Sequence, residues 1–229
     1  IASRRSARSL ADTRIDAVAV IGLGRFGTAV ARELARMGRD FLAIDEKMEI
    51  VQQMADEFAN VVQADSTNPA TLRRLGVHEL GAAVVAIGSD LEASVLTVLA
   101  LSEIGIPVIW AKAVNERHKR ILQRTGAHHV VMPEADRGRR VAHLVSTRMM
   151  DFIELDDGYA FVKTTPPEVL VGKPLSETHI REKFGVTVVG VKQPGECFTY
   201  ATEATVVQRG DILIVSGPTE KVERFTQLT

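Results

Sequence analysis

The sequence predicts an α/β fold in which a doubly wound parallel sheet precedes a smaller α+β domain. Short apolar runs alternate with longer segments of helical periodicity between residues 15 and 134, and this alternation is typical of parallel strands joined by right-handed crossovers. A glycine-rich turn follows the first apolar run. Beyond about residue 150 the apolar runs shorten, and five of the eight prolines lie in the last third of the chain. We therefore expect two domains of different architecture.

Composition narrows the class of protein. The chain is 45% hydrophobic and 25% charged, which is typical of globular domains. Its 28 basic and 29 acidic residues give a formal net charge of -1, so no overall field favours nucleic acid or an anionic membrane. No apolar stretch reaches the roughly 18 residues of a membrane-spanning helix. The single cysteine, Cys197, fits a reducing compartment. We expect a cytoplasmic protein that does not bind nucleic acid.

Three apolar runs predict the first half of the parallel sheet. Residues 17–21 (AVAVI) form a continuous apolar run, as expected for a strand that is covered on both faces. The apolar residues after it recur at helical spacing as far as Gly38, a residue that tolerates the left-handed geometry just past a helix end. A second strand over residues 41–44 precedes a helix that extends to about Phe58, and residues 60–63 form the third strand.

Three helix starts and three strands are predicted in the second half of the first domain. Asn68 before Pro69 predicts one helix start, because proline at the first helical position loses no hydrogen bond. Ser89 with Glu92 three residues later is typical of a capping box, and Asn115 predicts a third helix start. The strands of this half are expected at residues 82–87, 107–111 and 128–132.

Three further segments lie outside the first domain, which we assign to residues 15–134. Residues 1–14 carry four arginines and are expected to form a flexible basic arm. Residues 135–150 are predicted to form a connecting helix, and residues 151–229 are predicted to form a second, smaller domain. Domains of this size bury little apolar surface, and dimerisation often helps to stabilise them. Within it we expect strands at residues 152–155, 159–164, 186–191 and 212–215, and helices near residues 174–183 and 218–226.

The glycine-rich turn predicts a nucleotide site. Gly22, Gly24 and Gly27 match the GxGxxG pattern between an apolar strand and an amphipathic helix, which is the Rossmann-type context. In that context the first glycine permits the tight turn, the second admits a pyrophosphate and the third allows close helix packing. Asp45 ends the second strand, where a carboxylate accepts hydrogen bonds from ribose hydroxyls, although it is also placed to cap the next helix. We predict binding of ATP or ADP, with NAD as an alternative.

Other residues at the same edge of the sheet join the predicted site. Arg25 is unusual inside a phosphate turn, and it suggests either a longer phosphate chain or a nucleotide held by a neighbouring subunit, unless it is simply solvated. Glu134 follows the sixth strand and is either a metal-coordinating carboxylate, for Mg²⁺ or a monovalent cation, or part of a helix start. For Ser66 and Ser89 a turn or cap role is equally compatible, as is a solvated role for Lys112. The remaining predicted contacts are Phe26, Glu46, Lys47, Ala64, Asp65, Ile87 and Gly88.

Catalytic motifs are not recognisable in the sequence. A dehydrogenase needs a second domain that brings a substrate and a proton-transfer group to the nicotinamide, and the last third of the chain offers no such group in a known spacing. The histidines are scattered and form no catalytic or metal-binding pattern. We expect a non-enzymatic sensor, with an NAD-dependent oxidoreductase as the alternative. The histidines are His78, His118, His128, His129, His143 and His179.

Six segments of the chain carry a family resemblance. They are AVIGLGRFG at 19–27, AIDEK at 43–47, VVAIGSDLEAS at 84–94, PVIWAKA at 107–113, VVMPEADRG at 130–138 and IREKFGVTVVGVK at 180–192. Through these segments, residues 17–229 resemble the cytosolic regulators of Ktr and Trk potassium uptake, which consist of an N-lobe and a C-lobe of the RCK (regulator of potassium conductance) domain. The resemblance implies that the chain is a regulatory subunit and not an enzyme.

The resemblance also implies an assembly and a mechanism. In that family, dimers form a ring, usually an octamer, which docks on the inner face of the plasma membrane under a channel dimer, and bound ATP or ADP sets the shape of the ring. Carried over by position, Gly22, Gly24 and Gly27 hold the phosphates, and Asp45 holds the ribose. By the same resemblance Arg25 reaches the terminal phosphate of a nucleotide in the adjacent subunit, and Glu134 helps coordinate a cation beside the phosphates.

A second ligand is implied for the C-lobe. Some members of the family bind cyclic di-AMP between paired C-lobes, in a pocket whose segment matches residues 180–186 of this chain. The same residues would also suffice for a plain hydrophobic dimer contact with Arg181 at its rim, and both interpretations stay open on the sequence. The matching positions are Ile180, Arg181, Phe184, Gly185 and Val186.

Overall fold

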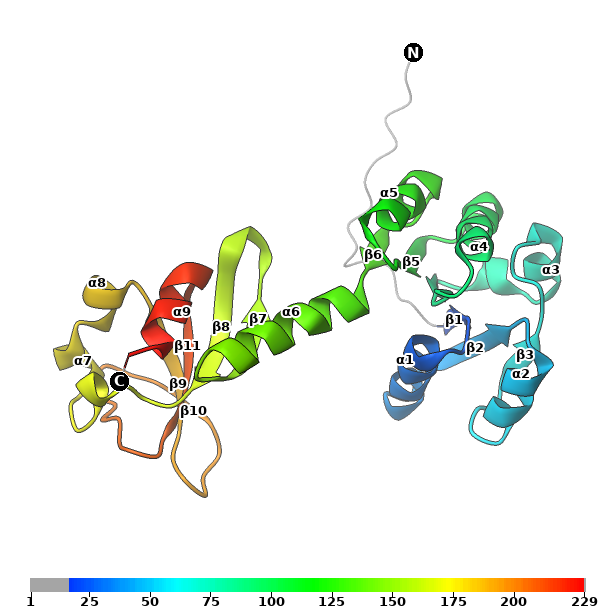
Figure 1. The fold of residues 1–229 in the computed structure, drawn as a ribbon. Coiled ribbons are helices and arrows are strands. Elements are labelled where there is room, and N and C mark those ends of the chain that lie inside the picture. Colours follow the sequence, from blue (N-terminus) through cyan, green and yellow to red (C-terminus); the bar gives the residue numbers. More distant parts are fainter. Residues whose placement is uncertain (1–16, 229) are drawn as a thin grey trace, which may run out of the picture. The chain divides into compact units, whose positions relative to one another are not determined.

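The computed structural model describes residues 17–228 and divides the chain into two compact units (Figure 1). The first unit ends at Pro133, and the second begins at Glu134. The basic arm expected at residues 1–14 lies outside the described residues. Within residues 17–228, no helix combines the length and the apolar character that crossing a membrane requires.

The first unit contains a six-stranded parallel sheet of order β3-β2-β1-β4-β5-β6. The order reverses between β1 and β4, and in open α/β sheets such a switch point is where ligands bind. This architecture confirms the predicted Rossmann-like doubly wound sheet. The strands are β1 (Ala17–Ile21), β2 (Asp40–Asp45), β3 (Val61–Gln63), β4 (Ala82–Val85), β5 (Val108–Lys112) and β6 (His129–Val131).

Helices cover both faces of this sheet. On one face, Ala31 of α1 and Met54 of α2 pack with Val20 of β1. On the other face, Leu101 of α4 and Leu122 of α5 pack with strand residues in a second apolar core. The helices are α1 (Arg25–Arg36), α2 (Met48–Ala55), α3 (Pro69–Arg74), α4 (Leu91–Ile104) and α5 (Glu116–Thr125), with a short 3-10 helix at Val77–Glu79.

The second unit is built on a five-stranded antiparallel sheet of order β10-β9-β11-β8-β7, which confirms the predicted smaller α+β domain. Its strands are β7 (Met149–Glu154), β8 (Tyr159–Thr164), β9 (Thr187–Lys192), β10 (Thr199–Tyr200) and β11 (Ile212–Pro218). Its helices are α6 (Pro133–Ser146), α7 (Leu175–Thr178), α8 (Ile180–Phe184) and α9 (Thr219–Thr226), with 3-10 helices at Asp156–Gly158 and Glu168–Leu170.

Two of the three predicted helix starts are confirmed, and one is wrong. The side chain of Asn68 accepts a hydrogen bond from the Ala70 amide, and that of Asn115 accepts one from the His118 amide. For α4, however, the cap is not Ser89. Asp90 takes the position and accepts a hydrogen bond from the Ala93 amide at 2.9 Å. Asp caps as well as Ser does, and the residue directly before the first helical turn is the one that caps.

Several predicted boundaries in the second unit differ from the observed ones. The connecting helix ends at Ser146 instead of residue 150, because Met149 already pairs with Thr164 of β8. The single helix expected near residues 174–183 is two short helices, since His179 adopts φ 52 and interrupts the helical backbone. The two-residue strand β10 was not predicted.

His118 of α5 is a buried histidine. The side chain of His118 is 2% exposed, and its Nδ1 accepts a hydrogen bond from the Val114 amide at 3.4 Å. Its Nε2 has no hydrogen-bond partner within residues 17–228. Burial lowers the pKa of His118 below its usual value, because the charged ring loses its hydration.

We expect His118 to make the first unit less stable in mild acid. The folded chain favours the neutral ring, so unfolding takes up a proton once the pH falls below the unfolded pKa of about 6.5. The free energy of unfolding should therefore fall between pH 7 and pH 5. Chemical denaturation at several pH values should show a shallower pH slope for His118→Asn than for the wild type. His78→Asn, at an exposed histidine, should keep the wild-type slope; an unchanged slope in His118→Asn would contradict this assignment.

Candidate functional site

In the glycine turn between β1 and α1, residue 27 lies so close to the Gly22 carbonyl that only glycine fits there. Gly22 has φ 89, and its amide donates a hydrogen bond to the Ile44 carbonyl at 2.8 Å. A Cβ on Gly27 would lie 1.8 Å from the Gly22 carbonyl oxygen. Since no side chain fits at that distance, α1 can lie against β1 only because residue 27 is glycine.

Gly24 differs from the other two glycines of the motif. It is the N-cap of α1 with extended backbone, and a Cβ there would meet no atom within 4 Å. Among the described residues, no side chain caps α1 and no acidic residue lies in its first turn. The first amides of α1 are therefore available to an external acceptor, and the helix dipole favours an anion there. This arrangement fits a phosphate group.

Asp45 links the glycine turn to the loop after β2. The residue is 8% exposed, and its Oδ2 accepts a hydrogen bond from the Leu23 amide at 2.7 Å. Its Oδ1 accepts one from the Lys47 amide at 2.9 Å. Lys47 is itself the N-cap of α2, so Asp45 does not occupy the cap position that was its alternative role. Each carboxylate oxygen has a second acceptor site, which leaves Asp45 able to bind a hydroxyl.

Thr28 supports the same turn from the helix side, and the sequence did not predict its role. Its hydroxyl donates a hydrogen bond to the Leu23 carbonyl at 2.8 Å and lies 3.9 Å from the Met54 sulfur. The side chain is buried between α1 and its neighbours. Leu23 is thus held at both backbone groups, by Asp45 and by Thr28. The only signal in the sequence is a polar residue directly after Gly27 on the buried face of α1.

Predicted site residues from the loop after β4 and from the end of β5 meet beside the glycine turn. Ile87 lies so close to Gly22 that a Cβ on the glycine would be 3.0 Å from the Ile87 side chain. A Cβ on Gly88 would be 3.4 Å from Lys112 Nζ, and that ammonium lies 5.9 Å from the centre of the Phe26 ring. The structure therefore brings Phe26, Gly88 and Lys112 together at the carboxyl edge of the sheet.

Two predicted site residues after β3 are engaged in local hydrogen bonds. The Ser66 hydroxyl is buried and lies 2.9 Å from the Thr97 hydroxyl of α4. Asp65 accepts hydrogen bonds from the Thr67 hydroxyl at 2.6 Å and from the Thr67 amide at 2.9 Å. These bonds lower the pKa of Asp65, the hydroxyl bond most. For both residues, the observed geometry is that of a structured turn. Ala64 is half-buried, and its amide bonds the Asp45 carbonyl at 3.0 Å.

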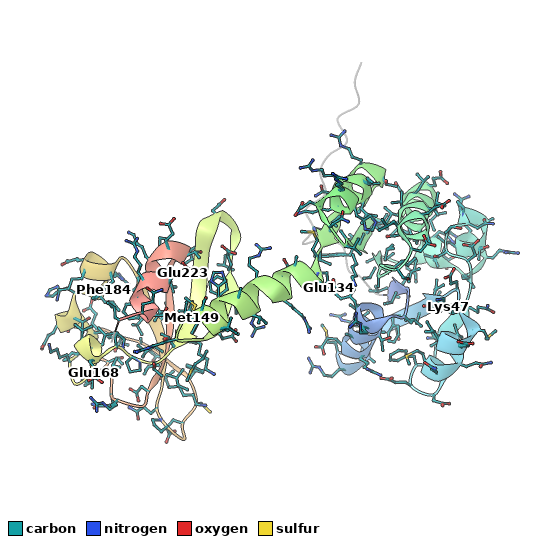
Figure 2. The ribbon with its side chains drawn as sticks, in the orientation of Figure 1. Lys47, Glu134, Met149, Glu168, Phe184 and Glu223 are labelled. Carbon is teal, nitrogen blue, oxygen red and sulfur yellow. The ribbon has the colours of Figure 1, made fainter. Side chains whose placement is uncertain are left out.

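The remaining predicted residues are exposed. Arg25, Glu46 and Ser89 are exposed in the first unit, as is Lys47, which Figure 2 labels on the loop after β2. Glu134 opens α6 at the start of the second unit. Within the described part of the chain, no group of three His, Cys, Asp or Glu side chains is arranged to hold a metal.

A separate basic pocket lies in the second unit. Its volume is about 290 Å³, and it includes three predicted residues, Arg181, Phe184 and Gly185, the second of which is labelled in Figure 2. The other two, Ile180 and Val186, are buried in the core of the unit instead. Four cations and one carboxylate among the lining residues favour an anionic ligand. The full lining is Arg181, Glu182, Lys183, Phe184, Gly185, Lys221, Arg224, Phe225 and Leu228.

Comparison with known proteins identifies both units. Residues 18–133 match the TrkA-N domain, and residues 160–229 match the TrkA-C domain. The chain is 36% identical over 208 residues to the Ktr system potassium uptake protein C of Bacillus subtilis (strain 168), covering 90% of this chain and 94% of that protein. It is 36% identical over 205 residues to the Ktr system potassium uptake protein A of Vibrio alginolyticus, covering 89% and 93%.

Solved structures share the fold. The GsuK RCK domain superposes with a TM-score of 0.65 at 19% identity, covering 94% of this chain and 48% of that chain. The GsuK channel bound to NAD gives a TM-score of 0.64 at 17% identity, covering 92% and 38%. The NAD(P)-binding domain of an exopolyphosphatase-related protein from Archaeoglobus fulgidus gives 0.51 at 25% identity, covering 58% and 98%.

The two glycines of the turn make a matched test of the site. Gly27→Ala should destabilise the first unit by at least about 2 kcal/mol, since the new methyl group must displace the Gly22 carbonyl. Gly24→Ala meets no protein atom, so it should leave the unfolding transition unchanged while lowering ADP affinity about tenfold or more. Thermal unfolding and calorimetric titration with ADP measure the two effects. Wild-type ADP affinity in Gly24→Ala would rule out a phosphate at this turn.

Proposed function

We propose a function for this chain, which belongs to the family of TrkA-N and TrkA-C domain proteins that includes the Ktr potassium uptake proteins. In this proposal the chain is a nucleotide-sensing subunit that gates a membrane potassium channel or transporter. The observation that carries the proposal is the Gly22–Gly27 turn, with its open amides at α1 and the buried carboxylate of Asp45 beside it. In this role the chain works at the cytoplasmic face of the membrane, where its channel partner holds it.

The ligand in this proposal carries an ADP moiety. The amides at the start of α1 would bind its phosphates, and Asp45 would accept hydrogen bonds from its ribose. ATP and ADP share this moiety with NAD. Two proteins that share the fold bind nicotinamide nucleotides, namely the GsuK channel bound to NAD and the NAD(P)-binding domain from Archaeoglobus fulgidus. We favour ATP and ADP as the regulatory pair because Arg25 suits a ligand with an additional terminal phosphate.

Arg25 is the residue that would distinguish the two nucleotides. It is exposed at the first helical position of α1, where the helix dipole makes a cation unfavourable. Within residues 17–228 no carboxylate pairs with it to offset this cost. We propose that it reaches the terminal phosphate of a nucleotide in an adjacent subunit. Lys112 would contact phosphates from the β5 side, and Glu134 would help hold Mg²⁺ or a monovalent cation there.

The proposed self-association would use exposed apolar side chains of α4 and α5. Leu96 and Leu99 of α4 are 40% and 41% exposed, and Ile121 of α5 is 50% exposed. These two helices pack against each other, and exposed apolar side chains on neighbouring elements are typical of an interaction surface. We propose that dimers of the chain assemble through such surfaces into a ring, which we expect to contain eight copies.

The gating mechanism is a shift between ring geometries. A nucleotide that touches two subunits favours one geometry only through its different affinity for the two states. Coupling of about 1 to 3 kcal/mol per site is typical and becomes large when several sites act together. An additional phosphate bound by Arg25 would supply such a difference, since ADP cannot make that contact.

The substitution Arg25→Ala tests this function. It should reduce the preference for ATP over ADP about fivefold or more while changing ADP affinity little, because only ATP offers the terminal phosphate. Calorimetric titration with each nucleotide measures the preference. As a control, Arg39→Ala removes an exposed arginine beyond the far end of α1. This variant should bind both nucleotides as the wild type does.

Equal losses for ATP and ADP in Arg25→Ala would count against the intersubunit contact. The wider proposal would fail if light scattering showed the wild-type chain as a monomer with and without each nucleotide. Turnover of NADH with a small-molecule substrate would instead support the alternative oxidoreductase.

The basic pocket of the second unit supports a second ligand, which we propose to be cyclic di-AMP. Two phosphates would meet the cations around the pocket, and Phe184 offers a ring on which a base can stack. The close approach of Gly185 to Lys221 brings that lysine to the pocket, since a Cβ on the glycine would lie 2.6 Å from its side chain. A plain dimer contact is the competing role for this surface.

The double substitution Lys221→Glu with Arg224→Glu separates the two roles. It should weaken cyclic di-AMP binding at least about tenfold, since it reverses two of the four cations. ADP binding to the first unit should persist, and Lys173→Glu, on an exposed lysine outside the pocket, should bind both ligands normally. If calorimetry detects no cyclic di-AMP binding to the wild type, the pocket serves another purpose.

A further inference from the structure

The helix α6 is held to the second unit mainly through side chains at its surface. None of its residues is buried, although Leu144 packs against the core of the unit. Residues 139, 140 and 143 lie on one side of the helix, since positions three or four apart share a face. Val141 and Val145 are 56% and 80% exposed. Polar contacts on its other face therefore dock α6 on the unit together with the packing of Leu144.

Three ion pairs make up that polar face. Arg140 bonds Asp151 of β7 at 2.7 Å, and Arg139 lies 3.7 Å from Glu154 of the same strand. The third pair joins α6 to α9, because His143 Nδ1 lies 3.0 Å from the Glu223 carboxylate. Figure 2 labels Glu223 on α9. One face of α6 is thus tied to two different elements of the second unit.

His143 is the most sheltered member of this face. Its side chain is 21% exposed, compared with 53% and 55% for the two arginines. Its ring stacks on Phe152, with the two ring centres 4.0 Å apart and the planes inclined by 22°. Phe152 is 4% exposed and belongs to the core. The imidazole therefore lies between a core aromatic ring and a carboxylate.

The protonation state of the ring changes the strength of both contacts. An imidazolium forms a charge-assisted hydrogen bond with Glu223 and a cation–π contact with Phe152, whereas a neutral imidazole donates at most an ordinary hydrogen bond. Arginines keep their charge at every physiological pH, but imidazole changes charge between about pH 5 and pH 8. The charged side chains around the ring are Glu223 of α9, Asp151 and Glu154 of β7, and Arg139 and Arg140 of α6.

We propose that His143, Phe152 and Glu223 form a proton-dependent latch that clamps α6 to the second unit when the ring is charged and loosens it when the ring is neutral. Because the charged ring makes the stronger contacts with Glu223 and Phe152, docking is strongest at low pH and weakens as the pH rises. Since α6 begins directly after β6 in the chain, the latch would make the segment that joins the two units sensitive to protons. The proposal does not depend on the nucleotide site.

Hydrogen exchange of the full chain tests the latch. Amide protection of residues 133–148, corrected for the intrinsic exchange rate, should be about three- to tenfold greater at pH 5.5 than at pH 8 in the wild type. His143→Gln should abolish this difference and show the weaker protection at both pH values. Glu223→Gln keeps the imidazole and should abolish the difference as well, so the test survives if one variant folds poorly.

A matched control comes from the same unit. His179 is 57% exposed and lies 3.6 Å from Glu182 without an aromatic contact among the described residues. His179→Asn preserves the left-handed backbone preference at this position and should retain the wild-type dependence of α6 on pH. Equal wild-type protection at the two pH values would overturn the latch. So would a pH difference that persists in both His143→Gln and Glu223→Gln.

Discussion

The carbonyl oxygen of Gly22 occupies the space that a side chain at residue 27 would need, and the first unit is organised around that contact. It allows α1 to start directly over the end of β1, so that the first amides of the helix converge on the switch point between β1 and β4. Asp45 and Thr28 then bind the amide and the carbonyl of Leu23 from opposite sides. Hydrogen bonds at the Gly22 amide and at both backbone groups of Leu23 therefore brace the turn.

The strands and two helix starts of the first unit could be predicted from the sequence, because they depend on periodicity and on local backbone geometry. The strands of the first unit are recognisable because buried parallel strands have apolar residues at nearly every position, and the helix starts at Asn68 and Asn115 because side-chain capping is local. The grouping expected at the carboxyl edge has the same basis, and the structure brings Phe26, Gly88 and Lys112 together there.

What the sequence could not predict depends on contacts between distant segments. The hydroxyl of Ser66 pairs with Thr97, which is 31 residues away, and nothing local distinguishes that role from ligand binding. The break at His179 requires a left-handed residue that sequence patterns assign to glycine or asparagine. The end of α6 is set by strand pairing with β8 and not by a stop signal in the helix. In each case a tertiary contact overrides the local preference.

Asp45 accepts hydrogen bonds from two backbone amides, so under the proposed function one carboxylate would serve both the architecture and the recognition of a ligand. Such a residue has little freedom to vary during evolution, because a change that alters ligand preference also removes a brace of the turn. Divergence among descendants of this chain should therefore accumulate at the side chains of Glu46 and Lys47, which are exposed on the same loop. The fold would thus keep its anchor constant while its surroundings adapt to new signals.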